Sequence, residues 1–176
     1  MASAPIWSEG PLKVHDVGGV RFQCAFIHSF VQSPQLERYP LVIWFCGLGP
    51  SGLDGIGVEL SLLSSASPKP FVLVAPIRSP ETWWVLNDSR PPFGCVFGSF
   101  SEGDVKRYCH WIGTLAESPG IDANSVSLFG GSAGAYAVSE VLASGTCNFH
   151  CVCLAGLHGH GRPDDVGLFP ECRNRL

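Results

Sequence analysis

Hydrophobic residues in the middle of the chain fall into two short runs separated by an amphipathic stretch. The runs 41–46 (LVIWFC) and 71–76 (FVLVAP) are continuously apolar, which is typical of parallel strands covered by helices on both faces. Between them, residues 55–66 place apolar side chains at near-helical spacing, until a Ser-Pro-Lys-Pro segment ends the pattern. We therefore expect a strand, a crossover helix and a second strand.

The N-terminal part of the chain has the pattern of a β-hairpin. Residues 12–16 and 20–30 are strand-like and flank Gly18-Gly19. This dipeptide suits a tight turn in which both residues take a positive φ. We expect an antiparallel hairpin at the entry to the sheet.

The second half of the chain alternates helical and strand-like segments. A helix with Ser101 as its N-cap is predicted to end at Ser118-Pro-Gly, and one face carries its apolar residues. A strand at 126–129, a helix at 133–143 and a strand at 149–155 follow. This order predicts a single α/β domain over residues 1–176, a three-layer sandwich with a mostly parallel sheet and right-handed crossovers.

Composition narrows the classes of function. The chain has 176 residues, of which 45% are hydrophobic and 15% charged, and its formal net charge is −4. It offers no basic face for a nucleic acid. No apolar run reaches the roughly 18 residues of a membrane span, and the N-terminus lacks a secretory leader pattern. We expect a cytoplasmic protein without a membrane span or a nucleic-acid partner.

The eight cysteines are interpreted as structural thiols. Most of them fall inside apolar strand or helix runs, which favours buried free thiols over disulfides. Cys151 and Cys153 would share one face of a strand, which is poor spacing for a zinc site. The nucleotide-binding motifs G-x-G-x-x-G and G-x-x-x-x-G-K-[ST] are absent. We expect neither a metal nor a cofactor.

The motif that carries most chemistry is Gly130-Gly131-Ser132-Ala133-Gly134, which fits G-x-S-x-G. A predicted strand runs into the first glycine, and a predicted helix starts just after the last. Such a turn holds its serine in a strained backbone conformation, and the glycines remove side chains that would collide. The hydroxyl then lies at a helix N-terminus, where the dipole favours a developing anion. Ser132 is the predicted nucleophile.

A second motif can supply the other part of such a site. A tetrahedral intermediate needs two backbone donors aimed at its oxyanion. One is the N–H of Ala133, directly after Ser132, and the other is expected from the glycine-rich loop 46–52 (CGLGPSG) after the third strand. A plain glycine turn is the alternative interpretation of this loop.

Together these motifs resemble the esterase and thioesterase branch of the α/β-hydrolases, the phospholipase/carboxylesterase and acyl-protein thioesterase group, with some likeness to polyhydroxybutyrate-depolymerase-like esterases. Gly47-Leu48-Gly49 is similar to the family's His-Gly-Leu-Gly loop, with Cys46 in place of the histidine. The run from Ile121 to Gly134 is similar to its elbow. Over roughly residues 41–156, the resemblance implies Ser132 as nucleophile and the Leu48 and Ala133 amides as oxyanion hole.

The C-terminal part departs from that family. Its members continue into a seventh strand followed by the triad acid, and an eighth followed by the triad histidine, whereas this sequence ends at Leu176. We expect a domain that lacks the last strands. Its final strand, 149–155, would be an open apolar edge, which favours a homodimer.

A serine hydroxyl needs a base within hydrogen-bond reach. His158 or His160 follows the last predicted strand, and Asp164 or Asp165 is available to orient the ring. We assign these roles to His158 and Asp164. The alternative, a solvated Gly/His loop, is favoured by the surrounding glycines.

The segment 77–100 has no clear period and is long for a loop. Trp83 and Trp84, together with two phenylalanines of this segment, either line an acyl pocket or pack the loop onto the sheet.

Two functions follow from these observations. The first is a serine hydrolase that cleaves a small-molecule carboxylic ester or thioester through an acyl-enzyme on Ser132. The alternative is a truncated or inactive hydrolase fragment that acts as a binding module.

Overall fold

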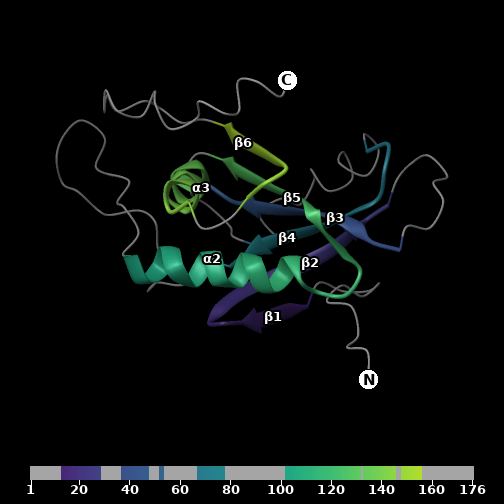
Figure 1. Cartoon of the computed structure of the whole chain (residues 1–176), viewed down its shortest axis with the longest axis horizontal. Coiled ribbons are helices and arrows are strands. Elements are labelled where there is room, and N and C mark those ends of the chain that lie inside the picture. The colour runs from purple at the N-terminus through teal and green to yellow at the C-terminus, as the bar shows by residue number, and fades with distance from the viewer. Residues whose placement is uncertain are drawn as a thin grey trace.

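The structure is a computed structural model that describes residues 13–28, 37–47, 52–53, 67–77, 102–131, 133–145 and 148–155. These residues form a six-stranded mixed sheet and two helices (Figure 1). The strands lie in the order β1-β2-β4-β3-β5-β6.

The chain enters the sheet through the predicted hairpin. Strands β1 (Val14–Val17) and β2 (Val20–Ile27) pair antiparallel. Gly18 and Gly19 have φ of 61° and 78°, the left-handed conformations that such a turn requires and glycine adopts without strain. The Asp16 carboxylate accepts a hydrogen bond from the Gly19 N–H at 3.2 Å.

The four remaining strands run parallel to one another and join the hairpin through one antiparallel pair. Strand β2 pairs antiparallel with β4 (Phe71–Pro76), and from there β3 (Tyr39–Phe45), β5 (Ile121–Gly131) and β6 (Cys151–Ala155) follow in parallel pairs. A mostly parallel sheet with an N-terminal antiparallel hairpin is what the sequence predicted. The carboxyl ends of these parallel strands all meet at one edge of the sheet.

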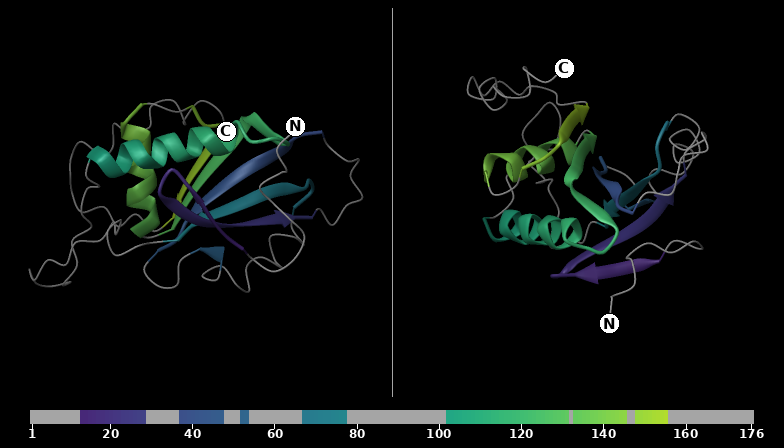
Figure 2. Two further views of the ribbon diagram at one scale, coloured as in Figure 1. Left: turned by 90° about the horizontal axis from the view of Figure 1, so that it is seen from below. Right: turned by 45° about the vertical axis from the view of Figure 1, so that its right-hand side comes forward.

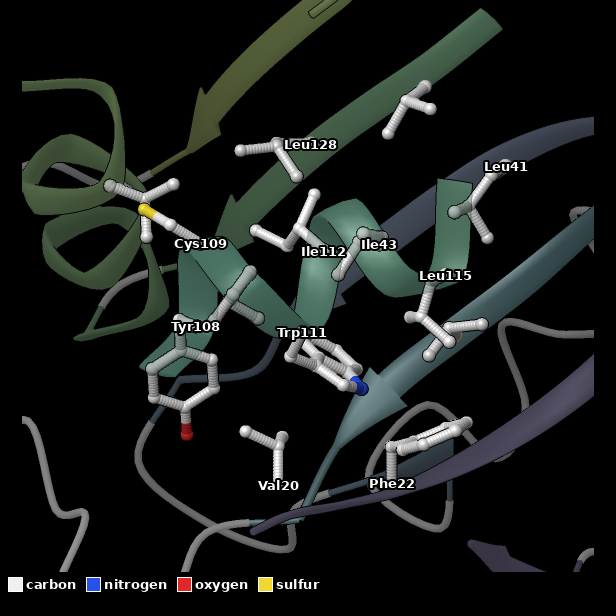
Figure 3. Packing of buried hydrophobic residues seen from close by; sticks show 14 of the residues in the cluster. Val20, Phe22, Leu41, Ile43, Tyr108, Cys109, Trp111, Ile112, Leu115 and Leu128 are labelled. Carbon is white, nitrogen blue, oxygen red and sulfur yellow. The ribbon is translucent and has the colours of Figure 1, made fainter. Parts of the chain in front are cut away.

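Both described helices cover the same face of the sheet (Figure 2). Helix α2 (Glu102–Ala116) and α3 (Ala133–Ala143) pack on a core of large side chains (Figure 3). Trp111 is fully buried there, with its ring 5.4 Å from that of Phe22. Burial of each such side chain contributes roughly 1.5–3 kcal/mol.

A second, smaller cluster lies on the opposite face of the sheet. Its buried members are Ile27, Cys46, Leu53, Leu73 and Ala75. The predicted crossover helix at 55–66 lies outside the described residues, so the third layer of the sandwich stays a prediction.

Strand β5 begins earlier than the pattern of apolar residues indicated. It was expected at 126–129, but Ile121 already pairs with Tyr39, and the register shifts before Leu41 pairs with Val126. The residues between form a polar turn, in which the Asp122 carboxylate accepts hydrogen bonds from the Asn124 N–H at 3.0 Å and the Ser125 hydroxyl at 2.8 Å. The polar sequence of this turn hides the start of the strand.

The structure corrects the interpretation of two cysteines. Cys24, Cys46 and Cys109 are buried free thiols as expected, but Cys151 and Cys153 are exposed free thiols. Strand β6 starts at Cys151 rather than at residue 149, and its residues alternate between exposed and half-buried. An apolar run predicts a strand without showing which of its faces is covered.

Among the described residues, no helix combines the length and the apolar character needed to cross a membrane.

Candidate active site

The connection between β5 and α3 is unusually short. Strand β5 ends at Gly131 and helix α3 begins at Ala133, so a single residue, Ser132, joins them. The position of Ser132 itself lies outside the described residues. A strand that passes into a helix within one residue forms the abrupt turn that a nucleophile elbow requires.

Two glycines allow the strand and the helix to pack this closely. A Cβ atom at Gly130 would lie 2.6 Å from the Ala135 Cα and 2.7 Å from the Gly134 carbonyl oxygen. A Cβ at Gly134 would collide with the Phe45 carbonyl and lie 2.8 Å from the Cys46 oxygen. Because these neighbours are backbone atoms, they cannot rotate out of the way. The first and last glycines of the G-x-S-x-G motif are therefore required by the local packing.

The same contacts place the start of α3 beside the end of β3. Phe45 is paired with Gly130 across β3 and β5, and the glycine-rich loop leaves β3 directly after Phe45. The two sequence motifs thus leave neighbouring strands at the same edge of the sheet. Ala133 is the first residue of α3, so its amide belongs to the first turn, where N–H groups have no partner within the helix.

The glycine-rich loop is fixed where it returns to the sheet. The Gly52 N–H donates to the Pro76 carbonyl at 3.2 Å, and the Cys46 thiol donates to the Gly52 carbonyl at 3.4 Å. The Leu53 N–H donates to the Gln23 side-chain oxygen at 2.7 Å. Gln23 was missed by sequence reasoning. The sequence shows only a polar residue between apolar residues of β2. In the structure, 6% of the Gln23 surface is exposed.

Most of the predicted site residues lie outside the described residues, and their roles stay predictions. They are the nucleophile Ser132, the oxyanion donor Leu48, the aromatic pair Trp83 and Trp84, the pair His158 and Asp164, and the alternatives His160 and Asp165.

Two histidines of the N-terminal hairpin region contact aromatic rings. The His15 ring stacks on Phe22 with centroids 5.3 Å apart, and His28 lies edge-on to Phe26 at 4.9 Å. Within the described part of the chain, no three His, Cys, Asp or Glu side chains gather where a metal ion would bind.

Among the described residues, two groups have clearly shifted pKa values, and neither is one of the predicted site residues. Burial raises the pKa of the Cys24 thiol to about 12, since an apolar surrounding disfavours the thiolate. The hydrogen bond from Ser125, followed by that from the Asn124 amide, lowers the pKa of Asp122. Arg38 and His150 add smaller electrostatic contributions in the same direction.

No protein family model and no curated protein matches the sequence. Among solved structures, a thermostable esterase is similar over 80% of this chain and 40% of its own, with a TM-score of 0.51 and 18% identity. A putative carboxylesterase from Lactobacillus plantarum WCFS1 is 14% identical over 82% of this chain and 58% of its own, with a TM-score of 0.46. An esterase from the Planctomycetes species Thermogutta terrifontis is 18% identical over 73% of this chain and 42% of its own, with a TM-score of 0.41.

The chain therefore spans about two fifths of the length of the thermostable esterase. At this level of identity the likeness concerns the fold alone. With its strand order and its short β5–α3 connection, the chain has the α/β-hydrolase fold, as the sequence predicted.

Proposed function

We propose that the chain is a serine hydrolase that cleaves carboxylic esters through an acyl-enzyme on Ser132. The observation that carries this proposal is the β5–α3 connection, in which one residue joins strand and helix while Gly130 and Gly134 lie against backbone atoms. A serine in such a turn presents its hydroxyl beside a helix N-terminus. The glycine-rich loop returns to the same edge of the sheet, where a second oxyanion donor is needed.

In the proposed mechanism, the Ser132 hydroxyl attacks the ester carbonyl while a base takes its proton. The Ala133 and Leu48 amides stabilise the oxyanion of the tetrahedral intermediate; loss of one such donor typically costs about 10²–10³-fold in kcat. Collapse of the intermediate expels the alcohol, which receives the proton from the base. Water activated by the same base then attacks the acyl-enzyme, and the carboxylic acid and free Ser132 are released.

His158 is our candidate for the base, with Asp164 to orient its ring, and His160 and Asp165 remain the alternatives. Trp83 and Trp84 are our candidates for the acyl pocket. A thioester would pass through the same intermediates with a thiol as leaving group, so the reaction admits both substrate classes.

The direct test is labelling with a fluorophosphonate probe, followed by peptide mapping. We expect the label on Ser132, and we expect Ser132→Ala to lower p-nitrophenyl acetate turnover by at least about 10³-fold. Ser139→Ala is the matched control: this serine lies on α3, where its hydroxyl donates to the Ala135 carbonyl at 2.7 Å, and its loss should leave both readouts unchanged.

Absence of labelling in the folded chain, under conditions in which a known serine hydrolase labels, would contradict the proposal and favour the binding-module alternative. His158→Ala and His160→Ala, measured separately, identify the base. Parallel assays with an oxygen ester and its thioester analogue establish the leaving-group preference.

A further inference from the structure

We infer that Gln23 is a positioning residue for the glycine-rich loop 46–52, in which the proposed oxyanion donor lies. Its buried carboxamide fixes the point at which this loop returns to the sheet. The inference deepens the proposed function and rests on it. Gln23 has no place among the reacting groups of that mechanism, so its effect would act through the loop.

The Gln23 side chain lies on the sheet face that carries the second cluster of buried residues. Gln23 pairs with Ala75 of β4, and its side chain is on the sheet face opposite to α2 and α3. Its Oε1 atom accepts a hydrogen bond from the Leu53 N–H at 2.7 Å, and Leu53 is fully buried. A buried backbone N–H must find an acceptor. Here a side chain 30 positions earlier in the sequence supplies it.

Gly52, the residue before Leu53, lies directly against the same Gln23 carboxamide. Gly52 has a φ of +70°, and a Cβ there would collide with the Gln23 Oε1 and come within 3.1 Å of the Ile77 side chain. A side chain at position 52 would therefore displace the group that holds Leu53. Glycine is needed both for the backbone conformation and for the space.

Three strands hold this short return segment. The Gln23 bond comes from β2, the Cys46 thiol contact from the end of β3, and the Pro76 carbonyl from β4. The proposed donor Leu48 lies in sequence between Cys46 and Gly52, both of which are fixed. Both ends of the segment that carries the proposed donor are therefore tied to the sheet, which is the kind of support that a preorganised oxyanion hole requires.

This placement gives a kinetic signature. An oxyanion donor acts on the charge that develops in the transition state, so a displaced donor lowers kcat more than it changes KM. We expect Gln23→Met, which keeps the length but removes the acceptor, to lower kcat by about 10- to 100-fold with KM within about twofold. Gln23→Glu retains an acceptor oxygen and should recover most of the activity.

Two controls separate positioning from general destabilisation. Ile27→Val removes one methyl group from the same strand and the same cluster, and it should lower the melting temperature without changing kcat. Hydrogen exchange of the Leu53 amide reports on its hydrogen bond to Gln23, here called the tether, without any assay of activity. We expect faster exchange in Gln23→Met than in the wild type, Gln23→Glu or Ile27→Val.

Gly52→Ala provides a second route to the same displacement if Gln23→Met folds poorly. It should lower kcat by a similar factor, and the double variant should lose little more than either single variant, because both remove one interaction. Losses that simply multiply would overturn the inference.

The remaining outcomes are also decisive. Unchanged kcat in Gln23→Met with faster Leu53 exchange would show that the tether does not position the loop. Unchanged Leu53 exchange in Gln23→Met, in an enzyme whose wild type labels with fluorophosphonate, would show that the Gln23 bond does not hold this segment and would overturn the inference. A wild type that fails to label would overturn the proposed function, and with it the catalytic role of Gln23.

Discussion

At the scale of single residues, burial divides the described cysteines into two classes. The Cys24 thiol is buried in the main core and its pKa is raised to about 12, whereas Cys151 and Cys153 are exposed on β6. Because the thiolate is the reactive species, burial lowers reactivity both by exclusion of the reagent and by protonation of the sulfur. The Cys151 and Cys153 thiols are exposed on β6, where a reagent reaches them.

We predict that a maleimide or disulfide reagent at pH 8 modifies Cys151 and Cys153 within minutes and leaves Cys24 unmodified until the chain unfolds. At that pH only about one Cys24 thiol in 10⁴ is ionised in the folded state. Peptide mapping by mass spectrometry measures each site, and labelling in denaturant is the control. Modification of Cys24 at the rate of Cys151 in the folded chain would contradict the buried position.

The hydrogen bonds of the Asp122 carboxylate contribute stability that is lost in acid. Its carboxylate accepts hydrogen bonds from Ser125 and Asn124, so its pKa is lower in the folded than in the unfolded state. The contribution is therefore complete above the unfolded value of about 3.9 and is lost as the pH falls through the lower folded value.

We expect Ser125→Ala to raise the pKa of Asp122 toward its usual range, measured by NMR titration of the carboxyl carbon. Ser118→Ala is the control, because that hydroxyl donates to the Thr114 carbonyl instead. Equal titration of Asp122 in the wild type and in Ser125→Ala would show that the turn does not hold the carboxylate.

At the scale of elements, the two glycines at the end of β5 differ in the space available for a side chain. Among the described residues, a Cβ at Gly130 would meet backbone atoms at 2.6–2.9 Å, whereas one at Gly131 would meet the Phe129 ring at 3.8 Å. We predict that Gly130→Ala destabilises the fold by about 1–3 kcal/mol, because neither the strand nor the helix can move away without loss of packing. Gly131→Ala should change stability by less than about 1 kcal/mol.

Urea unfolding of the three proteins measures this difference. Gly113→Ala on α2 is a further control. No described residue lies within 4 Å of the added Cβ, so the higher helix propensity of alanine should stabilise the chain by up to about 1 kcal/mol. Equal stability of Gly130→Ala and Gly131→Ala would mean that strand and helix are not in direct backbone contact.

The elements themselves were largely predictable because their hydrophobic patterns are local. Strand β4 and helix α3 have the bounds that the sequence indicated, and the Gly18-Gly19 turn closes the expected hairpin. The start of β5 could not be found from apolar periodicity, because the Asp122–Ser125 turn interrupts it with polar residues. Exposure on β6 depends on which elements cover it, and the run of apolar residues carries no such information.

At the scale of the whole molecule, the parallel sheet brings two sequence motifs together. The glycine-rich loop and the β5–α3 turn are about 80 positions apart in the sequence, but they leave adjacent strands at the same edge, where Phe45 pairs with Gly130. A family pattern predicted both motifs. Gln23 was not predictable, since its partner Leu53 becomes a neighbour only when β2, β3 and β4 are assembled.

The arrangement of strands also bears on the predicted homodimer. Within the described residues, β6 lies at one end of the sheet with β5 as its sole neighbour, and β1 lies at the other end. An apolar edge strand can pair with a second copy of itself through its backbone groups. We therefore expect a dimer in which the two β6 strands pair across a twofold axis.

Light scattering at micromolar concentration, with a reductant present to prevent cross-links through Cys151 and Cys153, tests this expectation. Cys153→Lys places a charge on β6, and lysine on an edge strand opposes pairing; this variant should shift the protein toward monomer. Val14→Lys, at an exposed position of β1, puts the same charge at the opposite edge and should leave the dimer intact. A wild type that is already monomeric, or a dimer weakened equally by both lysines, would place the interface elsewhere or exclude it.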